Sequence, residues 1–481
     1  MAYTIEQKPN QLAGANSPMV FVLKESDAAI YNANKFRYIA QVYISTTDAS
    51  TWVERAKLKL HKNGANVGIV DTHKIVRSYL ETQEKNVGNQ EAIAGSVHSI
   101  GISDTSNSYS QNTSQLVGVK IVGGYEKATS ATTAPVETLD QANTIRYSIP
   151  ATTTYTDTGT NVGGLDFIIT SPSSSNYPLT NYFPSGVTKK FLTNSPTVQF
   201  VRGSSTAGDN VDELTVAFIQ RGLVTSSTVM YKIIVEFFTA AGASINATNM
   251  ICTTGVGGQA TADDVKNSLI YFGCGTANLE NFNNGGTNLQ RPSNNANWAY
   301  YTIQATTSGS SALTQKYYFF RYGSGVTANP NNVLDDRHQS CTRYDNIRLA
   351  WRNRLGAWDY MNFRGKSTES IDITRSDMGS VPGTWDSATF TYDNWDRGKK
   401  TLHTEATRKL VINSDWLNPD EGVWLEELFT STNVQILADS NIVYPVVITN
   451  KNYTKKTSVN NKIKIQYTIN LEYANKVRTN S

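Results

Sequence analysis

The chain has 481 residues, and its 43 Lys and Arg nearly balance its 40 Asp and Glu, leaving a formal net charge of +3. This small excess, without any Lys/Arg run, argues against nucleic-acid binding. No run of about 18 apolar residues predicts membrane insertion, and no basic segment followed by an apolar one predicts a signal peptide. Only 17% of residues are charged and 10% are aromatic, and a chain rich in Ser, Thr, Asn and Tyr favours sheets with polar loops.

Residues 1–130 are predicted to form an N-terminal β-sandwich-like domain. Four segments have the composition or alternation typical of strands: Val20–Leu23, Phe36–Ile44, Ala56–Lys62 and Leu116–Tyr125. Val67–Leu80 is ambiguous, because its start suits a strand while Asp71 or Thr72 could cap one helical turn. Several strands within about a hundred residues fit a sandwich.

A Thr-, Ala- and Ser-rich segment around residues 127–160 predicts the boundary with a middle domain, residues 131–335. This domain is expected to be rich in β-strands joined by long polar loops. Its predicted strands are Leu165–Thr170, Val198–Arg202, Glu213–Arg221, Val229–Thr239, Trp298–Ala305 and Lys316–Tyr322. The segment Asp263–Gly273 is predicted to form one helix.

The C-terminal domain, residues 336–481, is richer in charged residues and Trp. Ile347–Trp351 and Ala357–Phe363 are expected to form a hairpin whose turn includes Gly356, a residue free to adopt a positive φ. Trp351 and Trp358 would pack on opposite sides of this hairpin.

A helix over residues 419–431 is the clearest helix in the sequence, with Asn418 as N-cap and Pro419 at its first position. Its expected apolar face consists of Trp424, Leu425, Leu428 and Phe429. The strands predicted after it are Val434–Leu437, Tyr444–Thr449 and Lys462–Tyr473. The last alternates strictly, with an inward face of Ile463, Ile465, Tyr467, Ile469 and Leu471.

The sequence contains no motif for catalysis, metal binding or cofactor binding. None of the five His residues belongs to an HExxH motif, no CxxC pair occurs, and Gly255–Gly258 lacks the context of a phosphate-binding loop. We therefore predict no enzymatic activity, no cofactor and no metal, although paired carboxylates of a glycosidase need no local spacing and stay open. The three cysteines suit synthesis in a reducing cytoplasm, with a Cys252–Cys274 disulfide as the alternative.

Clustered aromatic residues raise the alternative of sugar binding. Trp395 lies between Asp393 and Asp396, a pattern that favours a turn with an anchoring aromatic residue over a sugar site. Tyr300–Tyr301 and Tyr317–Phe320 place aromatic residues on both faces of their strands. Because cross-strand aromatic pairs stabilise sheets, we expect core or interface residues there, with a carbohydrate platform as the alternative.

Several stretches near the two ends of the chain form a recognisable pattern. Leu349–Phe363 is similar to W-x-N-x-L-G-G-x-D-x-x-x-F, with Ala357 in place of the second Gly. Ser414–Leu417, Trp424–Ser431 and Tyr444–Ile448 continue the pattern. In these stretches, and in Pro9–Phe21 and Phe36–Tyr43, the chain resembles structural proteins of tailed bacteriophages of Bacteroidetes-like hosts, the crAss-like type.

This resemblance implies a virion building block and transfers no catalytic residue, because its motifs are packing motifs. It leaves eight candidates for structural and assembly roles: Trp351, Gly356, Trp358, Trp416, Trp424, Leu425, Leu428 and Phe429. The expected fold is mainly β and multidomain, with β-sandwich-like domains and one short C-terminal helix packed on a small sheet.

The expected function is that of a structural protein in the tail, baseplate or a tail or collar appendage of the virion, made in the host cytoplasm. It would assemble with copies of itself and anchor other tail, baseplate or fibre proteins. One alternative is a receptor- or glycan-binding adhesin whose middle domain contacts a host surface glycan. A second is a virion enzyme that degrades polysaccharide.

Overall fold

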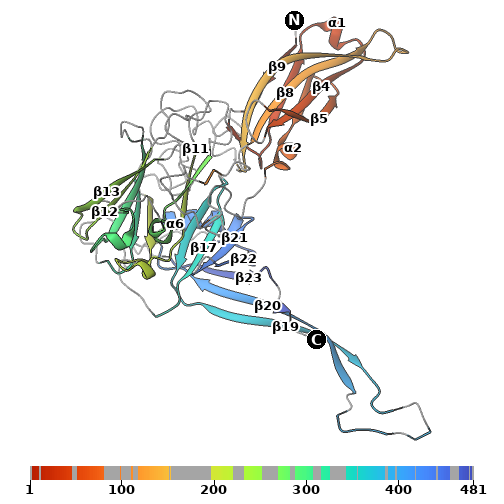
Figure 1. Ribbon diagram of the computed structural model, residues 1–481. Coiled ribbons are helices and arrows are strands. Elements are labelled where there is room, and N and C mark those ends of the chain that lie inside the picture. The colour runs from red at the N-terminus through yellow and green to blue at the C-terminus, as the bar shows by residue number, and fades with distance from the viewer. Residues whose placement is uncertain are drawn as a thin grey trace.

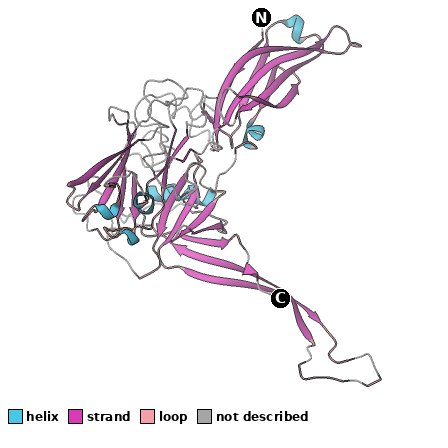
Figure 2. Ribbon diagram, viewed as in Figure 1, coloured by secondary structure: helices cyan, strands magenta, loops and turns pink. Residues whose placement is uncertain are grey.

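The computed structural model shows a chain that consists mainly of β-strands, with few and short helices (Figure 1 and Figure 2). It describes residues 3–9, 12–45, 51–80, 98, 110–111, 117–150, 152, 197–219, 232–251, 269–281, 288–306, 312, 316–324, 343–354, 356–384, 388–389, 391–395, 398–417, 419–439, 442–454, 465–475 and 477–478. The predicted fold class, mainly β with several sandwich-like sheets, is confirmed.

The N-terminal strands form a sandwich of two sheets. The first sheet has the order β1-β3-β6 and the second the order β2-β9-β8-β4-β5. Their bounds are β1 Tyr3–Gln7, β2 Leu12–Gly14, β3 Val20–Glu25, β4 Asn34–Ser45, β5 Val53–Leu60, β6 Val67–Asp71, β8 Val117–Ala128 and β9 Val136–Ile149. Phe21 and Leu23 of β3 are buried in the same core as Tyr38 and Val42 of β4, as expected when two sheets pack face to face.

Two short helices, α1 (Ala28–Tyr31) and α2 (His73–Arg77), accompany the sandwich. The ambiguous segment from Val67 therefore holds a strand followed by a helical turn. Asp71, the last residue of β6, accepts hydrogen bonds from the backbone N–H of His73 at 3.1 Å and from that of Met19 at 2.9 Å.

The boundary expected at residue 130 falls between β8 and β9, which pair antiparallel along most of their length. The N-terminal sheet therefore continues to Ile149. The Thr-rich composition suggested a boundary, but the segment contains the strand β9. In its last part, the apolar residues Ile145, Tyr147 and Ile149 occupy alternate positions. The segment forms a strand despite its composition, because β8 pairs with one of its edges and β2 with the other.

The middle strands form a five-stranded sheet, β10-β16-β15-β12-β13, and a three-stranded sheet, β11-β14-β7. Their bounds are β7 Ser110–Gln111, β10 Thr197–Val201, β11 Thr215–Ile219, β12 Lys232–Phe238, β13 Ser244–Ile251, β14 Leu269–Gly273, β15 Tyr300–Thr306 and β16 Tyr317–Arg321. The short helical turns of this region are η2 Ala207–Asp209, α5 Thr276–Glu280 and η5 Pro292–Asn294. The strand expected at Leu165–Thr170 lies outside the described residues.

The helix expected over Asp263–Gly273 is wrong in its described part, because Leu269–Gly273 is the strand β14. This segment begins Leu-Ile-Tyr-Phe, a run of apolar and aromatic residues that suits a strand with neighbours on both edges. It pairs antiparallel with β11 and β7.

The C-terminal sheet has eight strands in the order β18-β17-β21-β22-β23-β20-β19, with β24 also paired to β20. Their bounds are β17 Ile347–Arg352, β18 Trp358–Phe363, β19 Thr368–Gly379, β20 Lys399–Asn413, β21 Val434–Ala438, β22 Ile442–Ile448, β23 Thr468–Tyr473 and β24 Val477–Arg478. Helix α6 (Pro419–Thr430) lies where a helix was expected, while its predicted cap, Asn418, lies outside the described residues. Of the expected inward face of the last strand, Ile465, Tyr467, Ile469 and Leu471 are buried.

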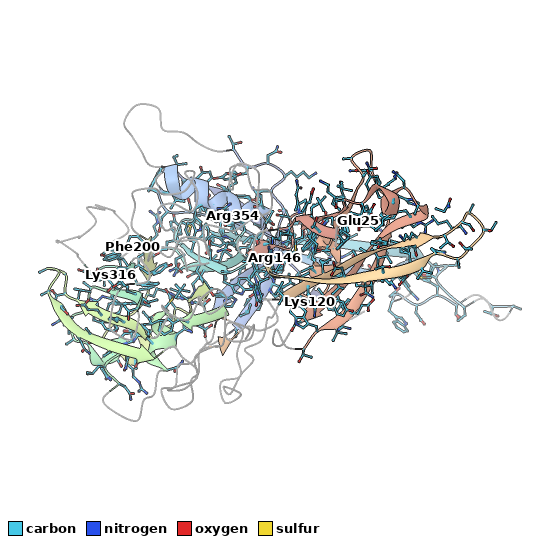
Figure 3. All side chains as sticks on the ribbon, turned by 90° about the horizontal axis from the view of Figure 1, so that it is seen from above. Glu25, Lys120, Arg146, Phe200, Lys316 and Arg354 are labelled. Atoms are coloured by element: carbon cyan, nitrogen blue, oxygen red, sulfur yellow. The ribbon has the colours of Figure 1, made fainter. Side chains whose placement is uncertain are left out.

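One continuous hydrophobic core joins the middle strands to the C-terminal sheet, and it includes Phe237, Trp298, Trp351 and Leu428. The N-terminal sandwich has a core of its own. In Figure 3, Glu25 and Lys120 lie in the sandwich, and Phe200 and Lys316 lie at the opposite end of the molecule. The middle and C-terminal segments thus pack as one body, and their expected boundary at 335 lies outside the described residues.

Candidate assembly interface

The hairpin formed by β17 and β18 lies between two packed layers. Arg352 pairs with Trp358 and Trp351 with Asp359, so the two Trp side chains lie on opposite faces, and both are fully buried. The ring centroids of Trp351 and of Trp424 in α6 are 5.0 Å apart. The indole Nε1–H of Trp424 donates to Asp359 Oδ2 at 2.8 Å. The hairpin is therefore held on one face by the helix.

On the other face, Trp358 packs against His98, which precedes β7 in the chain. The Trp358 ring lies 4.6 Å from that of His98, which also lies within hydrogen-bond distance of Tyr360 Oη and Gln435 Oε1, both at 2.8 Å. Burial lowers the pKa of His98 to about 3, and the nearby positive charge of Arg352 acts in the same direction. His98 is therefore a neutral packing residue at physiological pH.

The hairpin turn requires Gly356 for two reasons. Its φ is +84°, a conformation that residues with a Cβ rarely adopt. A Cβ at this position would also lie 2.7 Å from Cγ of Pro150, which directly follows β9. The turn thus contacts the end of the N-terminal sandwich, and the backbone N–H of Thr152 donates to the Arg354 carbonyl at 2.7 Å. Figure 3 labels Arg354.

The apolar side of α6 faces the C-terminal sheet. Leu425 and Leu428 are fully buried and Trp424 is nearly so, while Phe429 is half-buried against Tyr453, with ring centroids 4.7 Å apart. Trp416, in contrast, is 55% exposed and lies outside this cluster. Apart from Trp416, the candidates from the sequence therefore build the interior and present little surface to a partner.

Replacing Leu428 with Ala should lower the free energy of unfolding by about 2–5 kcal/mol, because it removes a fully buried side chain and leaves a cavity under α6. Urea unfolding of purified protein measures the change. The matched control is Glu426→Ala on the exposed side of the same helix, expected to stay within about 0.5 kcal/mol of the parent. Equal stabilities of the two variants would contradict the packing of this helix.

A buried ionic cluster joins the middle region to the hairpin. Asp212 Oδ1 lies 2.8 Å from Arg202 Nε and 2.9 Å from Arg348 Nη1, and its Oδ2 accepts from the Arg202 backbone N–H and from Asn362 Nδ2. Asp212 and Arg348 are almost fully buried. Burial alone raises the pKa of Asp212, but the charges of Arg348 and Arg202 outweigh it and lower the pKa below its ordinary value. This cluster holds the middle region against the hairpin through charges buried at Asp212 and Arg348.

Among the residues that the structure describes, no group of three or more His, Cys, Asp and Glu side chains could hold a metal ion. Cys274 is a free, buried thiol, and burial raises its pKa well above the ordinary range. The predictions that the chain is not an enzyme and binds no cofactor stay predictions. Within the described ranges, the longest helix has 12 residues, too few to cross a membrane.

The aromatic strands considered as a carbohydrate platform belong mainly to the interior. Tyr300, Tyr301, Tyr317, Phe319 and Phe320 are all buried. They stack on one another across β15 and β16, with Tyr301 and Phe319 centroids 4.8 Å apart. These five rings are therefore core residues, as expected, and are not available to a sugar, whereas Tyr318 of the same strand is partly exposed.

One exposed feature is a two-stranded projection, here called the arm: β19, β20 and the described residues between them. Figure 1 shows it extending away from the body of the molecule. All 12 residues of β19 are exposed. Four large apolar residues of the two strands are about half exposed or more: Ile371, Ile373, Met378 and Leu402.

The end of the arm also exposes large side chains. Val381 is 72% exposed, Tyr392 is 53% and Trp395 is 76%. Trp395 lies in a turn, as its sequence context suggested, but it is not the anchoring residue expected there because most of its surface faces solvent. Soluble monomers seldom expose so many apolar side chains on one projection unless it contacts a partner.

The sequence carried a signal for the strands of the arm that was overlooked. In Ser370–Ser376 the longer side chains Ile371, Ile373 and Arg375 alternate with Ser, Asp, Thr and Ser, and β20 contains several β-branched residues. Such a pattern predicts strands, but it does not reveal that they leave the body of the protein. Exposure depends on what the remaining chain covers.

No family model matches the chain, and no curated protein matches it. Among solved structures, trypsin-activated alpha-2-macroglobulin from Escherichia coli has 9% identity over 86% of this chain and 22% of that chain, with a TM-score of 0.17. Salmonella alpha-2-macroglobulin reacted with methylamine has 9% identity over 97% of this chain and 22% of that chain, with the same TM-score. The chain spans about a fifth of the length of these proteins, and at a TM-score of 0.17 the likeness carries no argument about fold or function.

Proposed function

We propose that the chain is a structural protein of a tailed-bacteriophage particle, located in the tail, baseplate or a tail or collar appendage. It assembles with copies of itself and anchors neighbouring tail or fibre proteins. The resemblance of both ends of the chain to such proteins supports this function. The architecture fits it, because a rigid β-rich body carries an arm that reaches beyond it (Figure 1).

The observation that carries the proposal is the exposure of the arm. A 12-residue edge strand that is exposed at every position is prone to pair with other chains, and soluble proteins usually shorten, cover or charge such edges. This strand carries four charged residues, but Ile371 and Ile373 expose apolar surface along it, and Tyr392 and Trp395 lie beyond its end. Tyr and Trp are the residues most enriched where proteins meet. The arm is therefore the part of the chain best suited to hold a neighbour.

The packing behind the arm suits the same function. A contact element holds a neighbour firmly only if its base is rigid. The strands at the base belong to the C-terminal sheet, whose buried side is closed by α6 and whose hairpin is joined to the middle region through Asp212 and Arg348.

The test is the particle itself. In purified virions, mass spectrometry should detect the chain in multiple copies, and cryo-electron microscopy should place it in the tail region. Each copy is expected to bury at least about 1,000 Å² against its neighbours. Absence of the chain from virions, or a single isolated copy without such contacts, would overturn the proposal.

Receptor or glycan binding is the second candidate function. The observation that favours it is the exposure of Tyr392 and Trp395 at the end of a long projection, where a sugar could stack on an aromatic ring. The two functions differ in the partner of the arm, which is a protein of the particle in the first case and the host surface in the second.

A further inference from the structure

The eight-stranded C-terminal sheet has open backbone edges, among the described residues, at β19 and at residues 399–404 of β20, and the edge of β19 is the longer. At one end of the strand order lies β18, whose six residues are all buried. At the other end lies β19, which pairs only with β20. The outer backbone N–H and C=O groups of β19 therefore face solvent along an exposed strand, and another strand could add to the sheet there.

The side chains of β19 divide between two faces. Glu369, Ile371, Ile373 and Arg375 share one face, because alternate residues of a strand point the same way. This is the face on which Ile371 lies opposite Arg408 of β20, whose guanidinium is 5.7 Å from the centre of the Tyr473 ring. Both isoleucines are 50% exposed, so apolar surface continues along this face to the edge of the sheet.

The order of residues on this face is self-complementary. In an antiparallel pair, residues directly opposite each other share a face and interact. If two copies of β19 pair antiparallel about a two-fold axis at Asp372, Ile371 lies opposite Ile373 of the second copy. Glu369, which already forms an ion pair with Arg408 of its own chain at 3.0 Å, then lies opposite Arg375 of the second copy. Each of these contacts occurs twice, and all four combine apolar with apolar or acid with base.

Neighbouring registers lack this match. Centring the pair on Ile371 would place Glu369 opposite Ile373. Centring it on Ile373 would place Glu369 opposite Asp377 and Ile371 opposite Arg375. Of these three registers, only the axis at Asp372 matches apolar with apolar and acid with base along this face, and its cost is the approach of two Asp372 carboxylates on the other face.

The opposite face accommodates the same register. Ser370 and Thr374 lie opposite each other there, and the two Asp372 side chains meet at the axis. Asp372 already forms an ion pair with Lys409 of β20, so each copy brings one ammonium group beside the two carboxylates. The repulsion between the carboxylates is thereby reduced.

We infer that the open edge of β19 is the contact between two copies of this chain, joined by antiparallel pairing of residues 368–376 about an axis at Asp372. The pairing makes one continuous sheet from two C-terminal sheets. It deepens the assembly role proposed above and rests on it, since it names the surface through which two copies meet.

Charge exchange tests the register on the full-length protein. Glu369→Arg alone places Arg opposite Arg, and Arg375→Glu alone places Glu opposite Glu. Each variant should dimerise at least about tenfold more weakly than the parent in sedimentation equilibrium, because two attractive pairs become repulsive. An equimolar mixture of the two variants, and the double variant, should both regain the affinity of the parent. Four equal affinities would overturn the proposal.

A cysteine at the axis provides a second test that detects weak pairing. Directly opposite residues of an antiparallel pair have Cα atoms about 4.5–5.5 Å apart, within reach of a disulfide. Asp372→Cys should therefore form a disulfide-linked dimer on mild oxidation. Thr374→Cys is the matched control and should not, because the two copies of residue 374 lie about 13 Å apart along the strands. The parent chain, with its own three cysteines, gives the background.

The outcomes separate this inference from the proposed function. If virions contain many copies but the variants incorporate normally and Asp372→Cys gives no dimer above the Thr374→Cys control, the β19 contact is wrong and the assembly role remains. If Asp372→Cys cross-links specifically while virions lack the chain, the contact remains and the virion role is wrong.

Discussion

Replacing Asp212 with Asn should lower the free energy of unfolding by about 3–5 kcal/mol, the range for removing one partner of a buried ion pair. Asn has nearly the same shape as Asp, so the change removes the charge and leaves little cavity. Arg348, 1% exposed and 2.9 Å from the carboxylate, would then retain a buried charge without its counter-ion. The loss should exceed that of any single surface change in this chain.

The control lies in the same cluster. Asp439 contacts the other side of Arg202 at 2.9 Å but is 58% exposed, and an exposed ion pair contributes about 0–1 kcal/mol. Asp439→Asn should therefore leave urea unfolding nearly unchanged. Because the pKa of Asp212 is lowered in the folded chain, its contribution is present at neutral pH and declines only as the pH falls below about 4. The stability of Asp212→Asn should accordingly depend less on pH in that range.

The unfolding curve of Asp212→Asn also tests how the chain divides. Asp212 belongs to the middle region, whereas Arg348 and Asn362 belong to the C-terminal hairpin. If the two regions form one cooperative unit, the whole transition that includes α6 should shift to lower urea. The opposite result would be that Asp212→Asn destabilises the middle strands alone, while the cluster of Trp351 and Trp424 still unfolds at the parental urea concentration. That result would contradict a shared core.

Local patterns predicted the elements whose signals lie within a few residues. The Pro419 start and the apolar spacing of Trp424 and Leu428 were sufficient for α6, and alternation was sufficient for the strand ending at Tyr473. Gly356 indicated the hairpin turn. Its contact with Pro150, some 200 residues earlier in the chain, could not be predicted from the local pattern.

Features that depend on distant partners were missed for a physical reason. The residues around Asp212 do not indicate that it pairs with Arg348, because this ion pair forms only when the middle strands pack on the hairpin. Likewise, composition predicted a boundary where β9 lies, and the segment that contains β14 was predicted to be a helix, because neither prediction took the neighbouring strands into account. The strands of the arm have an ordinary alternating pattern, and only the fold shows that neither face of β19 is covered.

Removing the end of the arm should abolish incorporation of the chain into particles without lowering its stability. Gly379 and Lys399 lie directly opposite each other in the register of β19 and β20. An Asn-Gly turn can therefore replace residues 380–398, because two residues of this type close an antiparallel pair. The deletion removes Val381, Tyr392 and Trp395, each more than half exposed, and keeps β19 and its open edge. The melting temperature should stay at the parental value, since these side chains contribute little to the core.

The single substitution Trp395→Ala measures the same contact more finely. A buried Trp at the centre of an interface typically contributes about 2 kcal/mol or more, which corresponds to about a 30-fold loss of affinity. The variant should therefore compete poorly with the parent for places in assembling virions, as quantified by mass spectrometry of particles grown with both forms. Ile69→Ala is the matched control at an apolar residue of β6 that is 52% exposed and lies outside the arm, and it should incorporate normally. If the deletion variant enters virions as well as the parent does but the particles lose binding to host-surface polysaccharide, the arm contacts the host instead, and the adhesin becomes the better account of this protein.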